Sequence, residues 1–532
     1  MNRREIIKRL SVLPLAGSYL PIESFMGAPS GPLGSGENIY KSIGVDPVIN
    51  CVGTYTIIGG SIERPEVVQA MHDASGFFVQ YDELAFGIGR RLAEITGAEW
   101  GMVSAGCAAG MKHVAAACVT GGNPERLIRI PDLTGFDKTE VVSLRNSRNS
   151  YDHSIRNIGV KMITVANLEE LGNSLSSRTA MIYLTAGGAK DGMLEAVAKL
   201  AKPLNIPILV DAAAEDLTIP NVHLQRGATI VAYSGGKAIC GPQCAGLLLG
   251  RKDILMSAWQ ASSPHHGPGR DNKVGKEEMI GMLAAVEAWV KRDHVEKMNI
   301  WRGYLSIVLK KISSINDVKC ELQEPKGLSN HSPSLIISWD PEKLNITGPE
   351  VAEDLATQQP RIAVHSDDDN ESGRTNITIV SGQMQPGNDK MVADRVYEVL
   401  SKKHPKAKAF AAPAANLKGR WDVNIEFYSS KSQHTITIEQ QEGNYLSGMH
   451  KGDFSTRDLV GIIDGDQIKL FSEEKPVADY IPFTFYGSVS VDIMSGQIYM
   501  GEYIKASFTA SKHKQTLSQK PIYVPKGQPL AT

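Results

Sequence analysis

The sequence has little charge imbalance and few cysteines. Among its 532 residues, 56 are Lys or Arg and 58 are Asp or Glu, which gives a formal net charge of -2. A surface that binds nucleic acid needs an excess of positive charge, so the composition predicts no nucleic-acid partner. The six cysteines are scattered, as expected for a chain that folds in a reducing compartment. Cys240 and Cys244 lack the CxxC spacing of a zinc knuckle, and we predict no metal site.

The N-terminal segment contains no apolar run long enough to remain in a membrane. Residues 2–8 are basic and residues 10–17 form a short apolar stretch, a layout typical of a signal peptide. The pair Arg3-Arg4 resembles the twin-arginine motif, whose export route carries proteins that have folded around a cofactor. This predicts an exported or periplasmic protein without a stable membrane anchor. The alternatives are an ordinary secretory signal, or a basic leader without export function that would leave the protein in the cytoplasm.

The length of the chain predicts more than one domain, because one hydrophobic core rarely extends over 532 residues. Two stretches, one rich in Pro, Gly and Ser and one in Ala, Lys and Pro, are expected to be linkers. The expected parts are a signal peptide and linker (1–36), a large domain (43–313), a small α+β domain (314–403), a second linker (404–415) and a β-rich C-terminal domain (416–512).

In the large domain, apolar runs that suit buried strands alternate with helical patterns. Such alternation predicts a mostly parallel sheet with helices on both faces. Pro65 is expected at the first position of a helix over residues 66–74, and Asp82 is expected to cap a helix that ends at Gly97. The expected strands are 101–104, 127–131, 181–185, 208–210, 230–233 and 245–249.

The two later domains have different patterns. Beyond residue 416, apolar and polar side chains alternate with Gly, Asn and Asp between the runs, which predicts an antiparallel β-sandwich or barrel. The small domain is expected to contain strands at 334–339, 361–365 and 376–380 and helices at 349–357 and 389–401.

Two chemically distinctive residues follow expected strands of the large domain. Asp211 ends the apolar run that starts at Ile206, and Lys237 follows the strand at 230–233. Parallel strands open at the same edge of a sheet, where ligands bind. A lysine there can form a Schiff base with the aldehyde of pyridoxal 5'-phosphate (PLP) and can act as the base for a Cα proton. An aspartate facing the pyridine nitrogen keeps the ring protonated, so that it accepts electrons when a bond at Cα breaks.

Each of these residues also has a purely structural explanation. A strand-terminal Asp is common as a helix cap, and a Lys in a Gly-rich loop is common as a solvated charge. Their joint occurrence with a phosphate cradle upstream favours the functional interpretation. The cradle is the run 104–110, which opens an apolar helix, so that backbone N–H groups around Ala105, Gly106 and Cys107 meet a phosphate. Ser234 is expected to donate its hydroxyl to the same phosphate.

Several stretches of the sequence together resemble one group of enzymes. They are 95–99, 104–110, 211–214, 234–237 with 241–243, and 269–278. The group is the selenocysteine-synthase-related fold-type I PLP enzymes, which includes D-glucosaminate-6-phosphate ammonia lyases. The resemblance covers roughly residues 43–402 and implies an aspartate-aminotransferase-like fold, PLP as the cofactor, and a homodimer or larger homo-oligomer with sites at subunit interfaces. It carries the cofactor roles to Asp211, Ser234 and Lys237, and places Ala213 against the ring.

Further residues are predicted to contact substrate or cofactor. Arg148 and Tyr151 stand where fold-type I enzymes often place a group that covers the ring or contacts substrate; otherwise they are polar loop residues. Arg361 begins a small-domain strand, where this fold commonly presents an arginine to a substrate carboxylate, with a surface ion pair as the alternative. Arg270 and Lys273 are expected to reach the cofactor phosphate of a neighbouring subunit.

The cofactor residues predict chemistry at Cα but do not fix the product. The preferred interpretation is a PLP-dependent lyase that carries out α,β-elimination with ammonia release on a small amino acid or an amino-sugar acid. The alternatives are selenium transfer onto seryl-tRNA, and racemisation or transamination of an amino acid. A non-catalytic binding protein with a vestigial PLP site is an alternative of another class. The selenium transfer is disfavoured because the linker runs directly into Ile43, without an extra helical tRNA-binding module.

Overall fold

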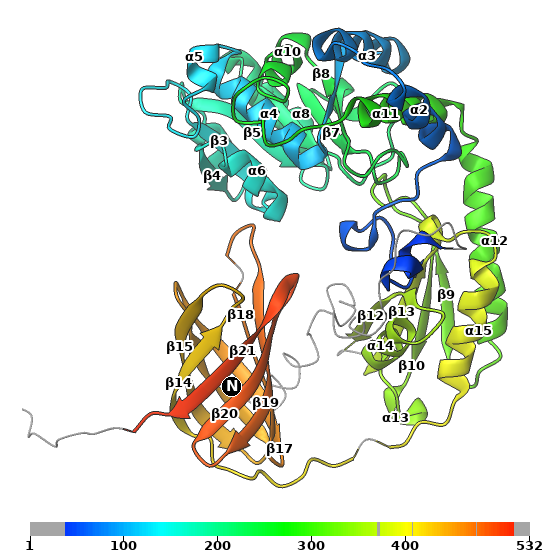
Figure 1. The fold of residues 1–532 in the computed structure, drawn as a ribbon, viewed down its shortest axis with the longest axis vertical. Coiled ribbons are helices and arrows are strands. Elements are labelled where there is room, and N and C mark those ends of the chain that lie inside the picture. The colour runs from blue at the N-terminus through cyan, green and yellow to red at the C-terminus, as the bar shows by residue number, and fades with distance from the viewer. Residues whose placement is uncertain (1–37, 370–372, 407, 475, 515–532) are drawn as a thin grey trace, which may run out of the picture. The chain divides into compact units, whose positions relative to one another are not determined.

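The computed structural model describes residues 38–369, 373–406, 408–474 and 476–514. The predicted signal peptide lies outside these residues. The described chain forms two compact units, one of residues 38–406 with 476–479 and one of residues 408–474 with 480–514. The first unit contains a large and a small domain, and the second contains the β-rich C-terminal domain (Figure 1). No helix in the described ranges is both long and apolar enough to span a bilayer.

The large domain is built on a seven-stranded sheet with the strand order β2-β8-β7-β6-β5-β3-β4. Strands β3 to β7 run parallel, while β8 is antiparallel to both β2 and β7. The predicted mostly parallel sheet is therefore confirmed. The strands are β2 (Trp100–Ser104), β3 (Glu140–Leu144), β4 (Lys161–Val165), β5 (Thr179–Thr185), β6 (Ile208–Asp211), β7 (Ile230–Ser234) and β8 (Gly246–Gly250).

Helices cover this sheet and leave its central strands buried. Helix α4 is buried over almost its whole length and packs against β2 and β5 to β8, which explains its run of small apolar residues. The helices of the large domain are α2 (Pro65–Ser75), α3 (Tyr81–Thr96), α4 (Cys107–Thr120), α5 (Pro124–Leu127), α6 (His153–Arg156), α7 (Leu168–Ser174), α8 (Met193–Ala201), α9 (Val222–Gln225), α10 (Lys252–Gln260) and α11 (Lys276–Lys291).

Two local predictions in the large domain are wrong. The strand expected at 127–131 is the end of α5 followed by turns, because Asn123 caps a short helix whose first residue is Pro124. Apolar runs of this length suit either structure, so periodicity alone does not separate them. Asp82 is not the cap of α3: the Gln80 side chain accepts from the N–H of Glu83 at 2.7 Å, while Asp82 accepts from Trp259 Nε1. Pro65 does begin α2, as expected.

The small domain packs helices against an antiparallel sheet with the order β12-β13-β10-β9. Its predicted strands and helices are all present, but the strand expected at 361–365 is divided between β11 and β12, because β11 pairs in parallel with β1 instead. The elements are β1 (Ile49–Asn50), β9 (Lys319–Gln323), β10 (Ser334–Trp339), β11 (Ile362–Ala363), β12 (His365–Asp369), β13 (Arg374–Val380), α12 (His294–Ile312), α13 (Pro341–Leu344), α14 (Gly348–Thr357) and α15 (Asn388–Ser401).

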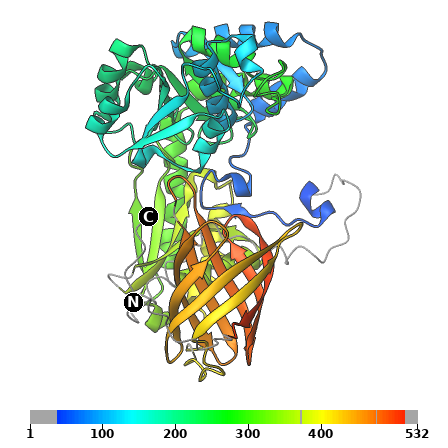
Figure 2. The same cartoon turned by 90° about the vertical axis from the view of Figure 1, so that its left-hand side faces the viewer.

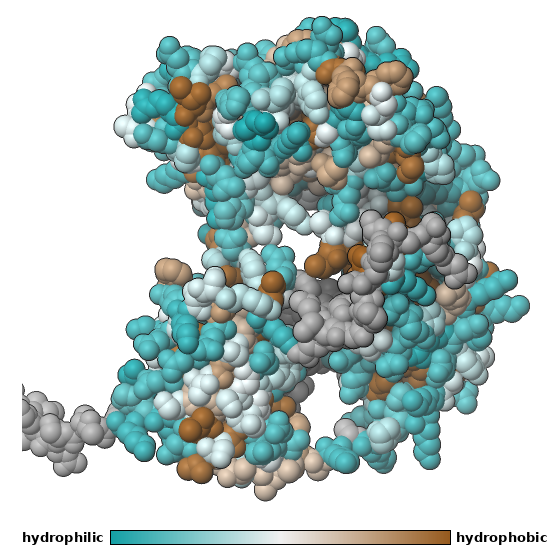
Figure 3. All heavy atoms as spheres, in the orientation of Figure 1, coloured by the Kyte–Doolittle hydropathy of each residue, from teal (hydrophilic) through white to brown (hydrophobic). Residues whose placement is uncertain are grey.

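The C-terminal unit is a closed antiparallel barrel in which each strand pairs with its neighbours in sequence, and the last strand pairs with the first (Figure 2). Alternate side chains point inward and form a core of its own that contains Trp421, Phe485 and Phe508. Figure 3 shows one face of the whole molecule, which is mostly hydrophilic with scattered apolar side chains. The strands are β14 (Gly419–Glu426), β15 (Lys431–Glu442), β16 (Tyr445–Lys451), β17 (Thr456–Asp464), β18 (Gln467–Glu474), β19 (Ile481–Ser490), β20 (Ile493–Met500) and β21 (Tyr503–Lys512).

Candidate active site

Asp211 and Lys237 lie at the carboxyl ends of two adjacent strands. Asp211 is the last residue of β6, and Lys237 lies in the loop that follows β7. The two strands are parallel, with Asp211 opposite Ala232. The Lys237 ammonium is close enough to lower the pKa of the Asp211 carboxyl. The arrangement expected from the sequence, in which both groups face one ligand, is therefore geometrically available.

The Asp211 carboxylate is buried and held by three donors. The Ala213 N–H donates to Oδ1 at 3.1 Å, the Tyr183 hydroxyl donates to Oδ2 at 3.2 Å, and the Cys107 thiol lies 3.7 Å from Oδ1. Asn149 Nδ2 in turn donates to the Tyr183 hydroxyl at 3.3 Å. These contacts fix the carboxylate in one orientation at the edge of the sheet.

Burial dominates the electrostatics of this cluster. It raises the pKa of Asp211, and the Ala213 N–H, the Lys237 ammonium, the Tyr183 hydroxyl and the Cys107 thiol act in the opposite direction. Burial also raises the pKa of Cys107 and of Tyr183, so both remain protonated donors at neutral pH. A buried carboxylate in such surroundings is stabilised by a positively charged partner.

A phosphate-sized group can be held at the N terminus of α4. Gly106 is the N-cap with φ of 86°, and the first bond of the helix runs from the Gly110 N–H to the Gly106 carbonyl. The N–H groups of residues 107–109 precede that bond and point out of the helix end. A Cβ on Gly246 would lie 2.4 Å from the Gly106 carbonyl carbon. Strand β8 therefore lies closer to this loop than any residue other than glycine would permit.

Three more predicted residues surround the same strand ends. The Lys237 ammonium lies 5.8 Å from the centre of the Tyr151 ring, which is 57% exposed. Ser234 ends β7, and its N–H donates to the Ala213 carbonyl at 3.3 Å. Ala213 is half-buried beside Asp211. The structure thus places Tyr151, Ala213 and Ser234 close to the two principal residues.

Other predicted residues have partners elsewhere. Arg148 forms a buried ion pair with Asp152 and donates to Thr164, which speaks against the substrate role predicted for it. Arg361 is buried, and its guanidinium donates to the backbone carbonyls of Ala356 and Asp46 at 2.9 and 3.2 Å.

Arg270 is exposed in the loop before α11. It donates to the Ser263 hydroxyl at 3.1 Å. The exposed Lys273 follows in the same loop. No contact with the strand-end cluster is described for Arg270, so its predicted role depends on a second subunit.

Tyr183 and Asn149 are site residues that the sequence reading missed. Tyr183 is fully buried in β5, the strand next to β6, and its hydroxyl reaches the Asp211 carboxylate. The available signal was a tyrosine inside an otherwise apolar strand, because a buried tyrosine hydroxyl needs a hydrogen-bond partner.

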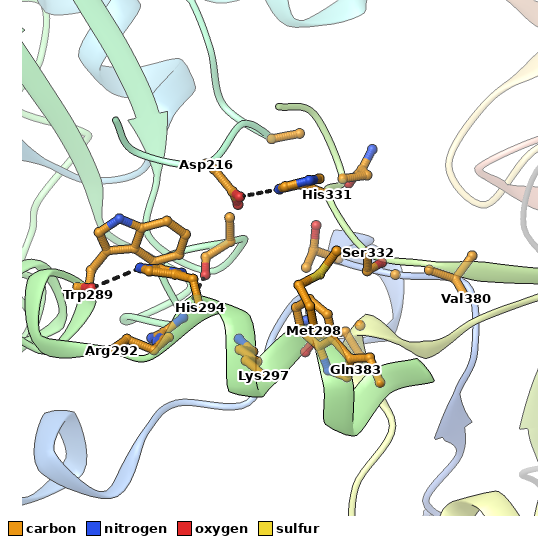
Figure 4. Close-up of a pocket in the computed structure, with 17 residues that line it drawn as sticks. Asp216, Trp289, Arg292, His294, Lys297, Met298, His331, Ser332, Val380 and Gln383 are labelled. Carbon is orange, nitrogen blue, oxygen red and sulfur yellow. Dashed lines mark hydrogen bonds and ion pairs between the residues drawn. The ribbon is translucent and has the colours of Figure 1, made fainter. Parts of the chain in front are cut away.

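A pocket of about 90 Å³ adjoins the loops that follow Asp211 and Lys237 (Figure 4). Ala214 and Asp216 come from the first loop and Ala238 from the second. The end of α11, the first turns of α12 and small-domain residues complete the wall. The charged and aromatic lining residues are Asp216, Trp289, Arg292, His294, Lys297, Trp301 and His331. The sequence reading did not identify this pocket.

The chain is similar to proteins with several activities. It is 32% identical to the D-glucosaminate-6-phosphate ammonia lyase of Salmonella typhimurium, over 54% of this chain and 79% of the relative. It is 32% identical to a 5'-C-glycyluridine monooxygenase-decarboxylase of Streptomyces sp, over 48% of this chain and 66% of the relative. It is 23% identical to the L-seryl-tRNA(Sec) selenium transferase of Proteus mirabilis, over 49% of this chain and 60% of the relative.

The solved structure of a D-glucosaminate-6-phosphate ammonia lyase superposes with a TM-score of 0.62 at 26% identity. The match covers 69% of this chain and 99% of that one. No protein-family model matches the chain.

Proposed function

This chain belongs to the family of D-glucosaminate-6-phosphate ammonia lyase, among the selenocysteine-synthase-related PLP enzymes of fold type I, and we propose that it releases ammonia from a small amino acid or an amino-sugar acid by α,β-elimination. The observation that carries the proposal is the pairing of Asp211 and Lys237 at adjacent strand ends, beside the N terminus of α4.

The residues at this edge fit PLP. The N–H groups at the start of α4 and the Ser234 hydroxyl would hold the phosphate. Asp211 would hold the ring nitrogen, because its buried carboxylate is stabilised by a cationic partner. Ala213 and Tyr151 would flank the ring, and Lys237 Nζ would bind the aldehyde carbon covalently. When bound, PLP supplies an electron-accepting ring that makes bonds at the substrate Cα easier to break.

The chain's own groups would then move the protons. Once the substrate amine has replaced it at the aldehyde carbon, Lys237 Nζ would be free to take the proton from the substrate Cα. Tyr183 and the Ala213 N–H keep Asp211 oriented, so its negative charge stays fixed while this proton moves. The protonated Lys237 Nζ would return this proton to the departing β-hydroxyl, which leaves as water. The enamine released then takes up one water and hydrolyses to a 2-keto acid and ammonia.

The test is to purify the protein, add PLP, and record its visible absorption. D- and L-β-hydroxy amino acids and amino-sugar acids, with and without a 6-phosphate, are then screened for ammonia and 2-keto acid. Lys237→Ala should lose both the absorption band and turnover. The exposed Lys199 on α8 gives a matched control, because Lys199→Ala removes an exposed lysine that is not among the predicted site residues. Substrate racemisation or amino-group exchange without ammonia would overturn the elimination.

We also propose that the chain is exported through its Arg3-Arg4 motif. The support is the order of basic and apolar residues at the N terminus. In cells, fractionation should find the protein in the periplasm. Changing Arg3 and Arg4 together to lysine should retain it in the cytoplasm, and an unchanged distribution would contradict the proposal.

We propose a homodimer or larger homo-oligomer as the active form. Three consecutive apolar residues between α2 and α3 support it: Phe77, Phe78 and Val79 are 72%, 103% and 47% exposed. Contiguous exposed apolar side chains mark interaction surfaces. Light scattering should give a multiple of the chain mass, and Phe78→Asp should shift the protein toward monomer. A monomeric wild-type protein with full turnover would exclude this form.

A further inference from the structure

The pocket beside the Lys237 loop carries positive charge that the described residues do not neutralise. Arg292 donates to the carbonyls of Ala238 and Ile239 at 3.4 and 3.3 Å, and Lys297 Nζ lies 4.6 Å from the centre of the Trp301 ring. Neither cation has a carboxylate within ion-pair distance in the part of the chain that the structure describes. Arg292 Nε is buried and has no hydrogen-bond partner there.

Burial and neighbouring positive charges both disfavour the charged form of Lys297. Burial lowers the pKa of Lys297 and the charges of Arg292 and Arg64 lower it further, while Cys240 and Asp216 act in the opposite direction. Burial likewise lowers the pKa of Arg292, with Arg64 acting in the same direction and Cys240 and Glu66 against it. Asp216 supplies the carboxylate among the lining residues. Its Oδ2 is hydrogen-bonded to His331 Nδ1 at 2.7 Å (Figure 4). An anion would relieve this repulsion and provide acceptors for the unused donors.

The remaining walls suit a hydroxylated ligand. Trp289 and Trp301 supply aromatic surface, and Arg292 also lies over the Trp289 ring at 4.9 Å. Asn330 and Gln383 supply amide groups. Sites that bind small polar metabolites combine polar groups with aromatic surface. The volume of this pocket is that of several water molecules.

We propose that this pocket binds the phosphate or carboxylate group of a small hydroxylated metabolite, through Arg292 and Lys297. The anion comes either from the distal end of the substrate held at Lys237 or from a separate effector. The binding site is independent of the proposed function, and only its assignment to the substrate rests on that function.

Inorganic phosphate is the probe, added to the PLP-loaded protein at constant ionic strength. Trp289 and Trp301 line the pocket, so their fluorescence reports binding without any turnover. A saturable change is expected. Arg292→Gln and Lys297→Met should each weaken the apparent phosphate affinity at least about tenfold, since each removes a charge-assisted donor. Lys297→Arg keeps the charge and should retain binding, which separates lost binding from lost folding.

Two exposed lysines give matched controls. Lys291→Gln changes the neighbour of Arg292, and Lys310→Met changes a residue further along α12; neither lines the pocket. Both should bind phosphate as the unaltered protein does. A fluorescence change of equal size in the unaltered protein, both pocket variants and both controls would be a nonspecific salt effect, and it would overturn the site. The absence of any saturable change would do the same.

Steady-state kinetics separates the two sources of the anion. If the anion belongs to the substrate, phosphate competes with a phosphorylated substrate, and Arg292→Gln raises KM for that substrate at least fivefold more than for its unphosphorylated analogue. If a separate effector binds, phosphate alters turnover of both substrates without competing. Either result supports the site, while failure of ammonia release leaves the fluorescence result standing and bears only on the proposed function.

Discussion

The strand-end cluster and the barrel interior both bury polar side chains in apolar surroundings, but they do so differently. In the barrel, His434 Nδ1 lies 2.9 Å from His450 Nε2, and His450 Nδ1 lies 2.7 Å from Ser472 Oγ. These side chains bond to one another, and Phe483 and Phe485 cover them with their rings. Among the described residues, His434 Nε2 and Arg457 Nε and Nη1 have no hydrogen-bond partner, so the barrel interior also contains unpaired buried polar atoms.

At the strand ends the buried polar groups lie at the edge of the sheet. Asp211 accepts from Tyr183 and from the Ala213 N–H, while burial raises its pKa and the Lys237 ammonium acts in the opposite direction. The Tyr151 ring beside Lys237 is 57% exposed. The difference teaches that burial of titratable groups does not by itself mark function, and that the strand ends are distinguished by a lysine and an exposed ring beside the buried carboxylate. The following changes test that distinction, from the largest expected effect to the smallest.

Replacing the buried carboxylate should have the largest effect. Asp211→Asn keeps the shape and removes the charge, so turnover should fall roughly 10²–10³-fold, as when a preorganised electrostatic partner is removed. The free energy of unfolding should change little or rise, because an uncharged amide avoids the desolvation that raises the pKa of Asp211. Steady-state kinetics and denaturant unfolding measure the two quantities. The exposed Asp73→Asn is the control, and equal activity of the two variants would refute the role.

Gly246→Ala should displace the cradle. The added Cβ would meet the Gly106 carbonyl carbon at 2.4 Å and the Cys107 nitrogen at 2.6 Å, and both atoms belong to the backbone. We expect a loss of about 1–3 kcal/mol in the free energy of unfolding and a weaker affinity for PLP, measured by titration of the apoprotein. Gly172→Ala on α7 is the control, since its Cβ would meet only the Leu200 side chain at 3.4 Å. Normal PLP affinity in the Gly246 variant would place the phosphate elsewhere.

The barrel histidines predict a pH dependence of stability. Burial lowers the pKa of His450 to about 3, with further lowering from His434 and Arg457. Between pH ~6.5 and about 3 the unfolded chain binds a proton that the folded barrel does not, so stability should fall as the pH falls, by at most ~1.4 kcal/mol per pH unit. Above pH ~6.5 the histidine is neutral in both states, so the full stability is present and no longer changes with pH through this group.

Hydrogen exchange of barrel peptides in the full chain measures this stability. His450→Leu should flatten the profile between pH 6.5 and 4. The exposed pair formed by His513 and Asp422 provides a control, because His513→Gln should leave the slope within error. A slope that survives His450→Leu unchanged would assign the pH dependence to other groups.

Removal of the barrel should have the smallest effect on chemistry. The barrel residues form a separate hydrophobic core, and the cores of the large and small domains contain no residue beyond Leu400. A chain that ends at residue 406 should therefore fold, bind PLP and turn over substrate within about twofold of the full chain. A large loss of turnover with intact PLP binding would show that the barrel contributes to the reaction.

The sequence was most informative where local order and strand topology coincide. Asp211 and Lys237 were predicted to meet because both follow apolar runs of one parallel sheet, and the structure brings them to its edge. An antiparallel sandwich or barrel was predicted from the alternation of apolar and polar residues alone, because each strand pairs with the next strand in the sequence. The choice between sandwich and barrel needed the pairing of β14 with β21, which is a long-range contact.

Residues whose partners come from distant segments could not be identified from the sequence. Tyr183, Arg292 and Lys297 acquire their partners through the folding of separate segments, and no spacing in the chain reveals those partners. Asp152 stands four residues after Arg148, a separation that allows a local ion pair, and the two side chains form one. Unlike the long-range contacts, this pairing can be anticipated from the sequence.

Helix α12 contributes both to the pocket wall and to the hydrophobic core of the small domain. Its first turns carry His294, Lys297 and Trp301 along the pocket wall, while Leu305, Val308 and Ile312 lie in the core of the small domain. Fifteen residues separate Lys297 from Ile312, a rod of roughly 22 Å at the usual rise per residue. One continuous helix therefore joins the pocket wall to the interior of the small domain, so both depend on the same rigid element.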